Sequence, residues 1–396
     1  MREVSDDQRR ARLARRHALA VRVDSVAEAV EQMTCLHATE PASVYLSVLA
    51  RTEATVAAVD AALYADRSVV KQLAMRRTLF VFPRELLPAV WGSAADRVAG
   101  QLWTRLAKEV ESNGLSDSGT AWLERRCGEV VGSLTEHGPS TTAELRERLP
   151  GLGQRVELAP GKSYGGSFPI ASRLLGALGA SGRVVRGANE GGWHLSRPRW
   201  SLTEDWLGEP VQRTDPAAGY LALVERWLRT FGPGTEADLV WWLGATKAAV
   251  RRALGELGAV EVAVAEGVGY LLPDDLEDVP APEPWGALLP VLDPTTMGWK
   301  QRGFYLAPGD VPHLFDGNGN AGSTAWWNGR IVGCWVQDPD GVVSVVLGHD
   351  IGADGVAALD VEADRLTTWL DGHRVGTVYP SALMKAGVDQ VGGRTS

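Results

Sequence analysis

Apolar residues recur every three to four positions through most of the first two thirds of the chain, a spacing that predicts helices with one buried face. Near the N-terminus, this spacing predicts helices over residues 6–20, 24–36, 42–49, 56–65 and 69–75. The β-branched and aromatic run TLFVF at 78–82 predicts a short strand after them. Helices followed by a short strand fit a winged helix, to which residues 1–115 add further helices.

The middle of the chain contains the same order of predicted elements twice. Each copy has a helix, a Gly-Pro stop, a short helix in the pattern T-x-A-[E/D]-L, a third helix and a two-stranded hairpin. The segments of the first copy are 121–135, 140–145, 168–178 and a hairpin with arms 183–186 and 193–195. Those of the second copy are 220–231, 235–239, 246–257, 260–264 and 270–272. Such a repeat predicts tandem winged-helix modules.

A linker rich in proline and acidic residues at 273–284 marks a domain boundary. Beyond it, short β-type runs predict a small antiparallel sheet or barrel, followed by an amphipathic helix at 356–370 and a short extended tail. The predicted strands are 324–327, 330–336 and 342–347. We therefore predict an α+β protein with three tandem winged-helix modules and a small C-terminal antiparallel β-barrel-like domain. The predicted domains are 1–117, which has extra N-terminal helices, 118–205, 206–280 and 285–396.

Composition narrows the class of protein. A hydrophobic fraction of 45% with 22% charged residues is typical of a globular chain. No segment has the roughly 18 apolar residues of a membrane span, and the arginine-rich start leads into no apolar signal core, so we expect a cytoplasmic protein without membrane contact. The three cysteines form no CxxC pair and the seven histidines form no HxxxH pair, so we predict no metal site, disulfide framework or cofactor.

Charge is unevenly distributed along the chain, whose formal net charge is -9. Residues 1–22 carry seven arginines against three acids, and residues 140–200 carry nine basic residues against four acids. Residues 201–290 reverse this, with fifteen acids against six basic residues. An acidic chain arranged in this way still presents a basic phosphate-binding surface in its first half. The alternative is that folding intermixes these runs.

Several segments carry a resemblance to a known family. They are LHATEPASVYLSVLAR at 36–51, MRRTLFVF at 75–82, LLPVLDPTTMGWKQRGFYL at 288–306, FDGNGNAGSTAWWNGRIVGCW at 315–335 and YPSALM at 379–384. Together they extend over almost the whole chain and resemble the N- and C-terminal signatures of the AlkZ/YcaQ-like winged-helix DNA glycosylases. The resemblance implies a monofunctional, monomeric glycosylase with three winged helices and a C-terminal β-barrel, acting on alkylated, often N7-linked, purines in double-stranded DNA.

The family's functional motif, Gln-x-Gln or Gln-x-Asp in its best-understood branches, stands where this chain has His37-Ala38-Thr39. Residues two positions apart do not share a helix face, but in an extended segment their side chains point the same way. Pro41 disfavours a helical conformation at Glu40 and so provides such a segment. We therefore predict that His37 and Thr39 are the catalytic residues and converge on one water molecule.

A histidine and a threonine suit this chemistry. An N7-alkylated purine is a cationic leaving group, so the enzyme chiefly positions a water and favours an oxocarbenium-like sugar. Histidine, whose unperturbed pKa is about 6.5, orients that water or accepts its proton, and Thr39 supplies a second hydrogen bond to the water or to a phosphate. Without the resemblance, His37 is interpreted as an ordinary helix-terminal histidine that caps carbonyls.

Basic residues near the predicted hairpins are the candidate DNA contacts. They are Arg76, Arg77, Lys162, Arg173, Arg183 and Arg186. Each of them equally fits a solvated surface charge. The tryptophan pairs at 241–242 and 326–327 fit stacking on a base, although tryptophans in such positions are more often core or interface residues. Glu40, beside the motif, is a further candidate for a part in catalysis.

Three functions compete at this point. A glycosylase would hydrolyse the N-glycosidic bond of an alkylated purine, including bulky genotoxin adducts in a self-resistance role. A non-catalytic winged-helix DNA-binding protein or regulator would bind DNA without excising a base. A protein-interaction scaffold would show no salt-dependent affinity for DNA.

Overall fold

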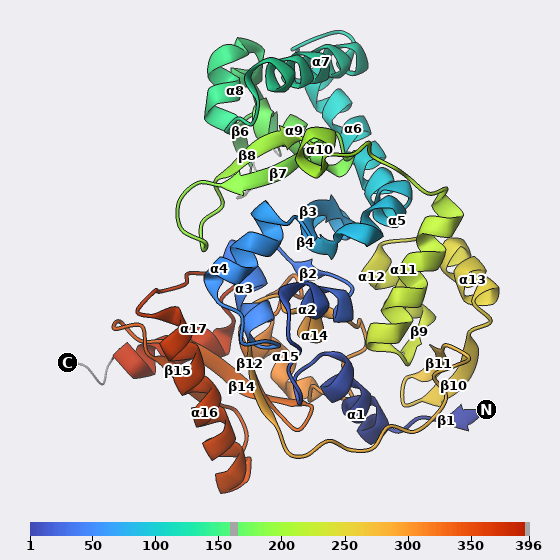
Figure 1. Ribbon diagram of the computed structural model, residues 1–396, viewed down its shortest axis with the longest axis vertical. Helices are drawn as coiled ribbons and strands as arrows, with labels where there is room; N and C mark the ends of the chain where they lie inside the picture. The colour runs from blue at the N-terminus through green and yellow to red at the C-terminus, as the bar shows by residue number, and fades with distance from the viewer. Residues whose placement is uncertain (159–164, 393–396) are drawn as a thin grey trace. The chain divides into compact units, whose positions relative to one another are not determined.

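The computed structural model describes residues 1–158 and 165–392, and the chain forms two compact units (Figure 1). The first unit contains Met1–Val69, Val81–Pro83 and Leu221–Ser396. The second contains Val70–Phe80 and Arg84–Tyr220. The first unit therefore joins the two ends of the sequence, whereas the second is built almost entirely from one continuous stretch.

The helices near the N-terminus begin at side-chain caps. Ser5, Ser25 and Thr55 each accept a hydrogen bond from a backbone N–H of the first helical turn. The elements are α1 (Asp6–Arg16), α2 (Val26–Gln32), β2 (Leu36–His37), α3 (Pro41–Leu49), α4 (Val56–Asp60) and the π-helical turn η1 (Ala61–Ala65). Periodicity thus located these helices, although α1 and α2 end earlier than their apolar spacing predicts.

The stretch 69–75, predicted as a helix, is instead the strand β3 (Val69–Ala74). It belongs to a three-stranded sheet of order β2-β4-β3, in which β4 (Thr78–Pro83) is the strand predicted from the TLFVF run. Val69 and Val70 are β-branched and both are buried. Strand pairing and burial therefore override the weak helical preference of the residues that follow them.

The second unit has its own core around three helices, against which residues 106–110 of a fourth helix also pack. In the middle one, α8 (Thr142–Arg148), the predicted capping box is present, because Thr141 and Glu144 each accept a hydrogen bond from the other's backbone N–H. Leu123 and Leu174, on the flanking helices, are fully buried in this core. The helices of this unit are α5 (Leu87–Gly92), α6 (Ala94–Ser112), α7 (Gly119–His137), α8, α9 (Ile170–Ala180) and α10 (Thr203–Leu207).

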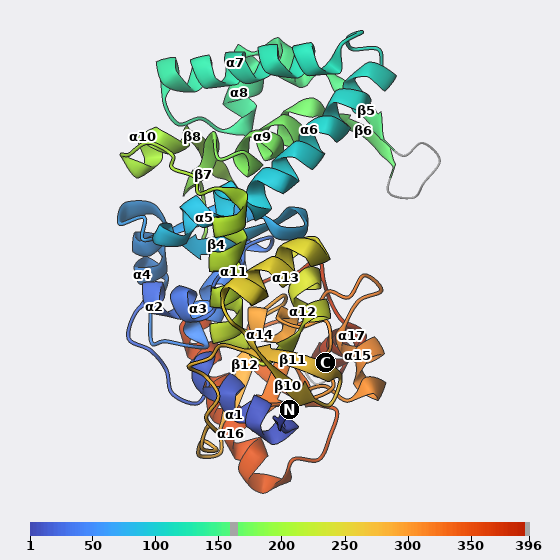
Figure 2. The ribbon, with the colours of Figure 1, turned by 90° about the vertical axis from the view of Figure 1, so that its right-hand side faces the viewer.

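Two hairpins accompany these helices. The hairpin after α9 pairs β7 (Val184–Asn189) with β8 (Pro198–Leu202), so the predicted second arm at 193–195 is wrong and lies in the connecting loop. The register places Trp200 on the core side, and burial of this indole fixes the position of β8. The other hairpin, β5 (Arg155–Leu158) with β6 (Gly166–Pro169), lies beside the C-terminal end of α6 (Figure 2).

The elements between 216 and 271 follow the order predicted for the second copy of the repeat. They are α11 (Pro216–Phe231), β9 (Gly234–Thr235), α12 (Glu236–Leu243), α13 (Lys247–Glu256), β10 (Val260–Val264) and β11 (Gly267–Leu271). Thr235 and Asp238 form a second capping box at the start of α12. The strand β1 (Arg2–Glu3) adds parallel to β10 and completes a sheet of order β1-β10-β11-β9.

The C-terminal sheet is antiparallel with the order β12-β13-β14-β15. Its strands are β12 (Gly286–Leu289), β13 (Thr324–Trp327), β14 (Arg330–Gln337) and β15 (Val343–Leu347). Within residues 1–158 and 165–392, this sheet is open and does not close into the expected barrel. The helix α16 (Gly352–Leu370) packs against both edge strands, β12 and β15. It therefore covers the edges of strands that would have no exposed edge in a closed barrel.

The tail predicted as extended ends in a helix, α17 (Ala382–Gly392), which packs against β14. Ser381 explains its start, because the Ser381 hydroxyl accepts a hydrogen bond from the backbone N–H of Met384. The extended part of the tail is confined to the residues before Ser381. The sequence therefore contained a capping signal that the prediction of an extended tail overlooked.

Candidate active site and nucleic-acid interface

Residues 37–39 lie on the bend that joins β2 to α3. The strand β2 ends at His37, and α3 begins at Pro41 after an extended Glu40 with φ −97° and ψ 121°. His37 is buried, with 6% of its surface exposed, whereas Thr39 is exposed. The structure thus has an extended Glu40 before Pro41, but His37 is buried in the first unit whereas Thr39 is exposed, so the two residues differ in burial although the sequence predicts that their side chains converge.

Glu40 binds the C-terminal tail. Its Oε1 accepts hydrogen bonds from Thr377 Oγ1 at 2.9 Å and from the backbone N–H of Val378 at 2.6 Å, and the residue is only 8% exposed. A carboxylate with two donors is satisfied and holds its segment in place. This geometry suits a residue that positions the bend at 37–39 rather than one that takes part directly in catalysis.

The helix α3, directly after the bend, is fixed by a buried ion pair. Arg51 binds Asp293 through two hydrogen bonds, Nη1 to Oδ2 at 2.9 Å and Nη2 to Oδ1 at 2.7 Å, and both side chains are fully buried. Ser47 on α3 donates to the same carboxylate at 2.7 Å. Burial by itself would raise the pKa of Asp293, but the charge of Arg51 and these hydrogen bonds outweigh it and hold that pKa below its usual value. The pair therefore anchors α3 to the chain around 293.

His17 completes this buried network. Its Nδ1 lies 2.9 Å from Thr295 Oγ1, to which Arg51 also donates, and its Nε2 lies 3.2 Å from the carbonyl oxygen of Thr230. Burial, together with the neighbouring charge of Arg51, lowers the pKa of His17 to about 3. His17 is therefore neutral at physiological pH and joins the end of α1 to α11 and to the segment after Asp293.

Two of the predicted DNA contacts form the turn between β3 and β4. Arg76 and Arg77 both have positive φ, 54° and 60°, which is uncommon for residues other than glycine. Two consecutive residues of this kind are what a tight hairpin turn requires, and asparagine and glycine usually occupy these positions. Arg76 is half-buried and Arg77 is exposed. The turn therefore holds Arg77 at the surface of the second unit at a cost in backbone strain.

The remaining predicted contacts lie around α9 and the hairpin after it. Arg173 forms an ion pair with Glu109 of α6. Arg183 is exposed, and the guanidinium of Arg186 lies 5.2 Å from the centre of the Trp200 ring, where burial lowers its pKa. Lys162 lies outside the described residues. Arg183 is therefore the member of this group that is most accessible to a phosphate.

The arginine run of residues 1–22 does not form the basic surface that the charge distribution indicated. Arg9 binds Glu266 at 2.6 Å, and Arg12 and Arg16 bind Asp275 at 2.7 and 2.6 Å. Folding brings α1 against the acidic stretch of the chain, so the two runs neutralise each other. The alternative that folding intermixes charge runs is correct for this segment, because a buried guanidinium requires an anionic partner.

The tryptophan pairs belong mainly to the core. Trp242 and Trp326 are buried, and the indole Nε1 of Trp326 donates to Thr324 Oγ1 at 2.9 Å. Trp241 is half-buried, with the guanidinium of Arg302 5.5 Å from its ring centre. These surroundings fit packing better than stacking on a base.

In the part of the chain that the structure describes, no group of three or more histidine, cysteine, aspartate or glutamate side chains is arranged to hold a metal ion. Cys35, Cys127 and Cys334 are buried, and none of the three is part of a disulfide. Among the described helices, none is both long and apolar enough to cross a bilayer.

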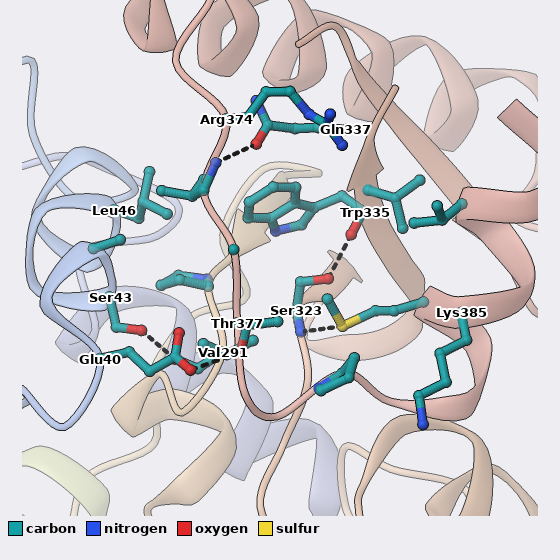
Figure 3. Close-up of a pocket in the computed structure, with 18 of the residues that line it drawn as sticks. Glu40, Ser43, Leu46, Val291, Ser323, Trp335, Gln337, Arg374, Thr377 and Lys385 are labelled. Atoms are coloured by element: carbon teal, nitrogen blue, oxygen red, sulfur yellow. Dashed lines mark hydrogen bonds between the residues drawn. The ribbon is translucent and has the colours of Figure 1, made fainter. Parts of the chain in front are cut away.

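Sequence reasoning missed a cavity of about 540 Å³ in the first unit (Figure 3). Its walls come from the start of α3, residues 290–291, the end of β14, the tail at 374–380 and α17. Glu40, which directly follows Thr39 in the chain, is one of its lining residues. No sequence motif predicts this cavity, because its lining residues lie in segments that are widely separated in the chain.

Comparison with known proteins identifies the family. A family model described as DNA glycosylase AlkZ-like matches residues 30–369. The structure is similar to that of the Streptomyces sahachiroi DNA glycosylase AlkZ, with a TM-score of 0.73 and 20% sequence identity over 92% of this chain and 97% of that one. A search of curated protein sequences gives no significant match. The chain therefore belongs to the AlkZ-like DNA glycosylase family, and it is a DNA glycosylase.

Proposed function

We propose that this glycosylase is monofunctional and monomeric, hydrolyses the N-glycosidic bond of alkylated purines in double-stranded DNA, and uses His37 and Thr39 as its catalytic residues. The observation that carries the site is that the bend at 37–39 is held by two anchors that follow it in the chain. Glu40 fastens it to the tail, and Arg51 fastens α3 to Asp293. Holding one water at a sugar carbon depends on such fixed positioning.

N7-guanine adducts match the groups at the bend. Alkylation at N7 makes the purine cationic, so the base departs without a proton from the enzyme. In the proposed step, the water oxygen bonds to the sugar carbon C1′, the bond from C1′ to the base breaks, and its electron pair neutralises the purine. His37 accepts the proton that the water loses, and Thr39 hydrogen-bonds to the water or to a neighbouring phosphate.

The proposed DNA surface lies on the second unit. Arg77 and Arg183 are exposed, while Arg76 and Arg186 are half-buried beside them in the chain. We assign all four to phosphate contacts, together with Lys162. Arg173 joins them if a phosphate replaces Glu109 as its partner. The helix and hairpin order of 118–205 and 206–280 supports winged-helix modules as the scaffold.

The proposal includes bulky adducts of genotoxic natural products, whose removal would protect the DNA of the organism that produces them. The predominance of arginine over lysine and the many alanine and glycine residues fit a GC-rich genome, as in many producers of such compounds. The reaction is the same for a small and a bulky adduct, because in both the alkylated purine is already a cationic leaving group.

The test is excision from duplex DNA carrying one N7-methylguanine, with abasic sites revealed by alkaline cleavage. We expect cleavage above spontaneous depurination, with His37→Ala reducing kcat about 100- to 10,000-fold, the usual contribution of a general base. Thr39→Ala should reduce it by a smaller factor. The control is His313→Ala, because His313 is an exposed histidine on the helix α15 (Val311–Leu314). A folded His37→Ala enzyme with the wild-type rate would refute the assignment.

A further inference from the structure

The cavity beside the bend has the size of a small-molecule site. Its volume of about 540 Å³ lies within the roughly 300–1,000 Å³ of typical ligand pockets. Leu46, Val291, Trp335, Met384 and Val388 are among its apolar lining residues. In Figure 3, the Trp335 indole lies in the middle of the lining, between Leu46 and the α17 side. An aromatic wall of this kind favours a ligand with a ring system.

The polar groups inside the cavity already have partners in the protein. Ser43 Oγ donates to the carbonyl oxygen of Val291 at 2.8 Å, and Ser323 Oγ donates to that of Trp335 at 2.5 Å. The Gln337 amide donates to two carbonyl oxygens and accepts from the backbone N–H of Val375. A ligand in the interior therefore finds few free hydrogen-bonding groups, and an apolar body loses least on entering.

The charged groups of the lining cancel. Arg374 and Lys385 are exposed and lie at opposite ends of the cavity in Figure 3, and in the described part of the chain neither forms an ion pair. Glu40 and Asp389 also line it. A charged ligand thus gains no net attraction from the lining as a whole. The chemistry selects an uncharged ring system, while the exposed cations at the ends tolerate an attached polyanion such as DNA.

We propose that this cavity binds an uncharged apolar ring system, either as a free small molecule or as the substituent of an alkylated base. The second source rests on the proposed function. It is supported by the place of Glu40 in the lining, since its Cα lies about 3.8 Å from that of Thr39. A base whose sugar carbon is attacked by a water bound at Thr39 would therefore have its substituent within reach of the cavity.

The first arm of the test measures binding of free anthracenylmethanol to the full chain by fluorescence anisotropy. Wild type should bind saturably, and Val388→Trp, which adds bulk at the cavity wall, should raise the dissociation constant at least about tenfold. Met384→Ala, which removes an apolar wall, should raise it severalfold. Val361→Trp is the matched control, because Val361 is 65% exposed on α16 and is not part of the lining. No saturable binding, or binding indifferent to both lining variants, overturns the proposal.

The second arm compares excision of N7-(anthracenylmethyl)guanine with that of N7-methylguanine. If the cavity takes the substituent, Val388→Trp should lower the ratio of the two kcat/KM values about 10- to 200-fold, and Val361→Trp should leave it unchanged. An unchanged ratio combined with binding of the free probe identifies the free small molecule as the ligand. Failure of wild type to excise either lesion refutes the proposed function, while the first arm still decides the cavity.

Discussion

Two groups of arginines that look alike in the sequence occupy opposite environments. Arg9, Arg12 and Arg16 on α1 are bound by Glu266 and Asp275 inside the first unit. In the second unit, by contrast, Arg77 and Arg183 are exposed beside hairpin strands. A guanidinium that leaves water must be paired, so the first group stabilises the fold and keeps little charge for a partner. Only the second group keeps its charge exposed to solvent, as a contact with DNA phosphates would require.

The largest expected effect lies at the most buried of the paired arginines. Arg51→Ala should lower the free energy of unfolding by about 3–5 kcal/mol, because it leaves the Asp293 carboxylate buried without its cation. Urea unfolding followed by circular dichroism measures this loss. Arg105→Ala, which removes an exposed ion pair with Glu109 on α6, should cost at most about 0.5 kcal/mol. Equal losses in the two variants would mean that burial does not determine how much the ion pair of an arginine contributes to stability.

A smaller effect should appear as a pH dependence beside Arg51. The unfolded chain protonates His17 below about pH 6.5, whereas burial and Arg51 keep the folded chain from doing so until about pH 3. The stability contributed by neutral His17 is therefore complete above pH 6.5 and is lost as the pH falls, by about 2 kcal/mol at pH 5. Urea midpoints between pH 7 and 5 measure it. His17→Asn should flatten this slope, and an unchanged slope in that variant would contradict the assignment.

The exposed group should be visible in the salt dependence of DNA binding. Arg77→Ala and Arg183→Ala should each lower the slope of log affinity against log salt by about one, the value for one lost phosphate contact. Fluorescence anisotropy with a labelled duplex between about 50 and 200 mM salt measures the slope. Arg15→Ala is the control, because Arg15 belongs to the N-terminal run but is exposed on α1. A larger change for Arg15→Ala than for Arg77→Ala would restore the N-terminal run as a DNA surface.

The smallest effect concerns backbone strain in the turn between β3 and β4. Arg77→Gly should raise the free energy of unfolding by about 0.5–1 kcal/mol, because glycine adopts a φ of 60° without steric cost. The same variant should bind DNA more weakly. The shift of the urea midpoint and the binding titration together test whether this turn gives up stability to hold a cation at the surface. Loss of stability together with unchanged DNA binding would show that the arginine serves the fold.

Local signals located most elements, and their failures have specific causes. The capping boxes at Thr141 and Thr235 fix the starts of α8 and α12 because they act within four residues. The segment 69–75 was predicted wrongly because pairing with β4 decided it. The second arm of the hairpin after α9 was misplaced because burial of Trp200, and not turn chemistry, sets its register.

The candidate site likewise contains residues that local sequence signals located and residues that only the fold brought together. His37 and Thr39 were found through a short motif and the effect of Pro41 on Glu40, and their catalytic role stays a prediction. Arg51 and Asp293 carried a weak signal, a lone arginine at the end of an apolar helix and an aspartate before a proline. Nothing in the sequence pairs them, because they lie far apart in the chain and meet only when the first unit folds.

The sequence by itself determined the helices, the repeat, the family signatures and the location of the 37–39 motif, because periodicity, capping and proline act over a few neighbouring residues. Only the tertiary structure decided which arginines keep their charge, that the C-terminal sheet is open, and that a cavity forms beside the bend. Charge pairing, sheet edges and cavities depend on segments brought together from distant parts of the chain. Which charges are paired, which strand edges are covered and where a cavity forms all follow from which residues are buried together, and the order of residues alone does not specify that.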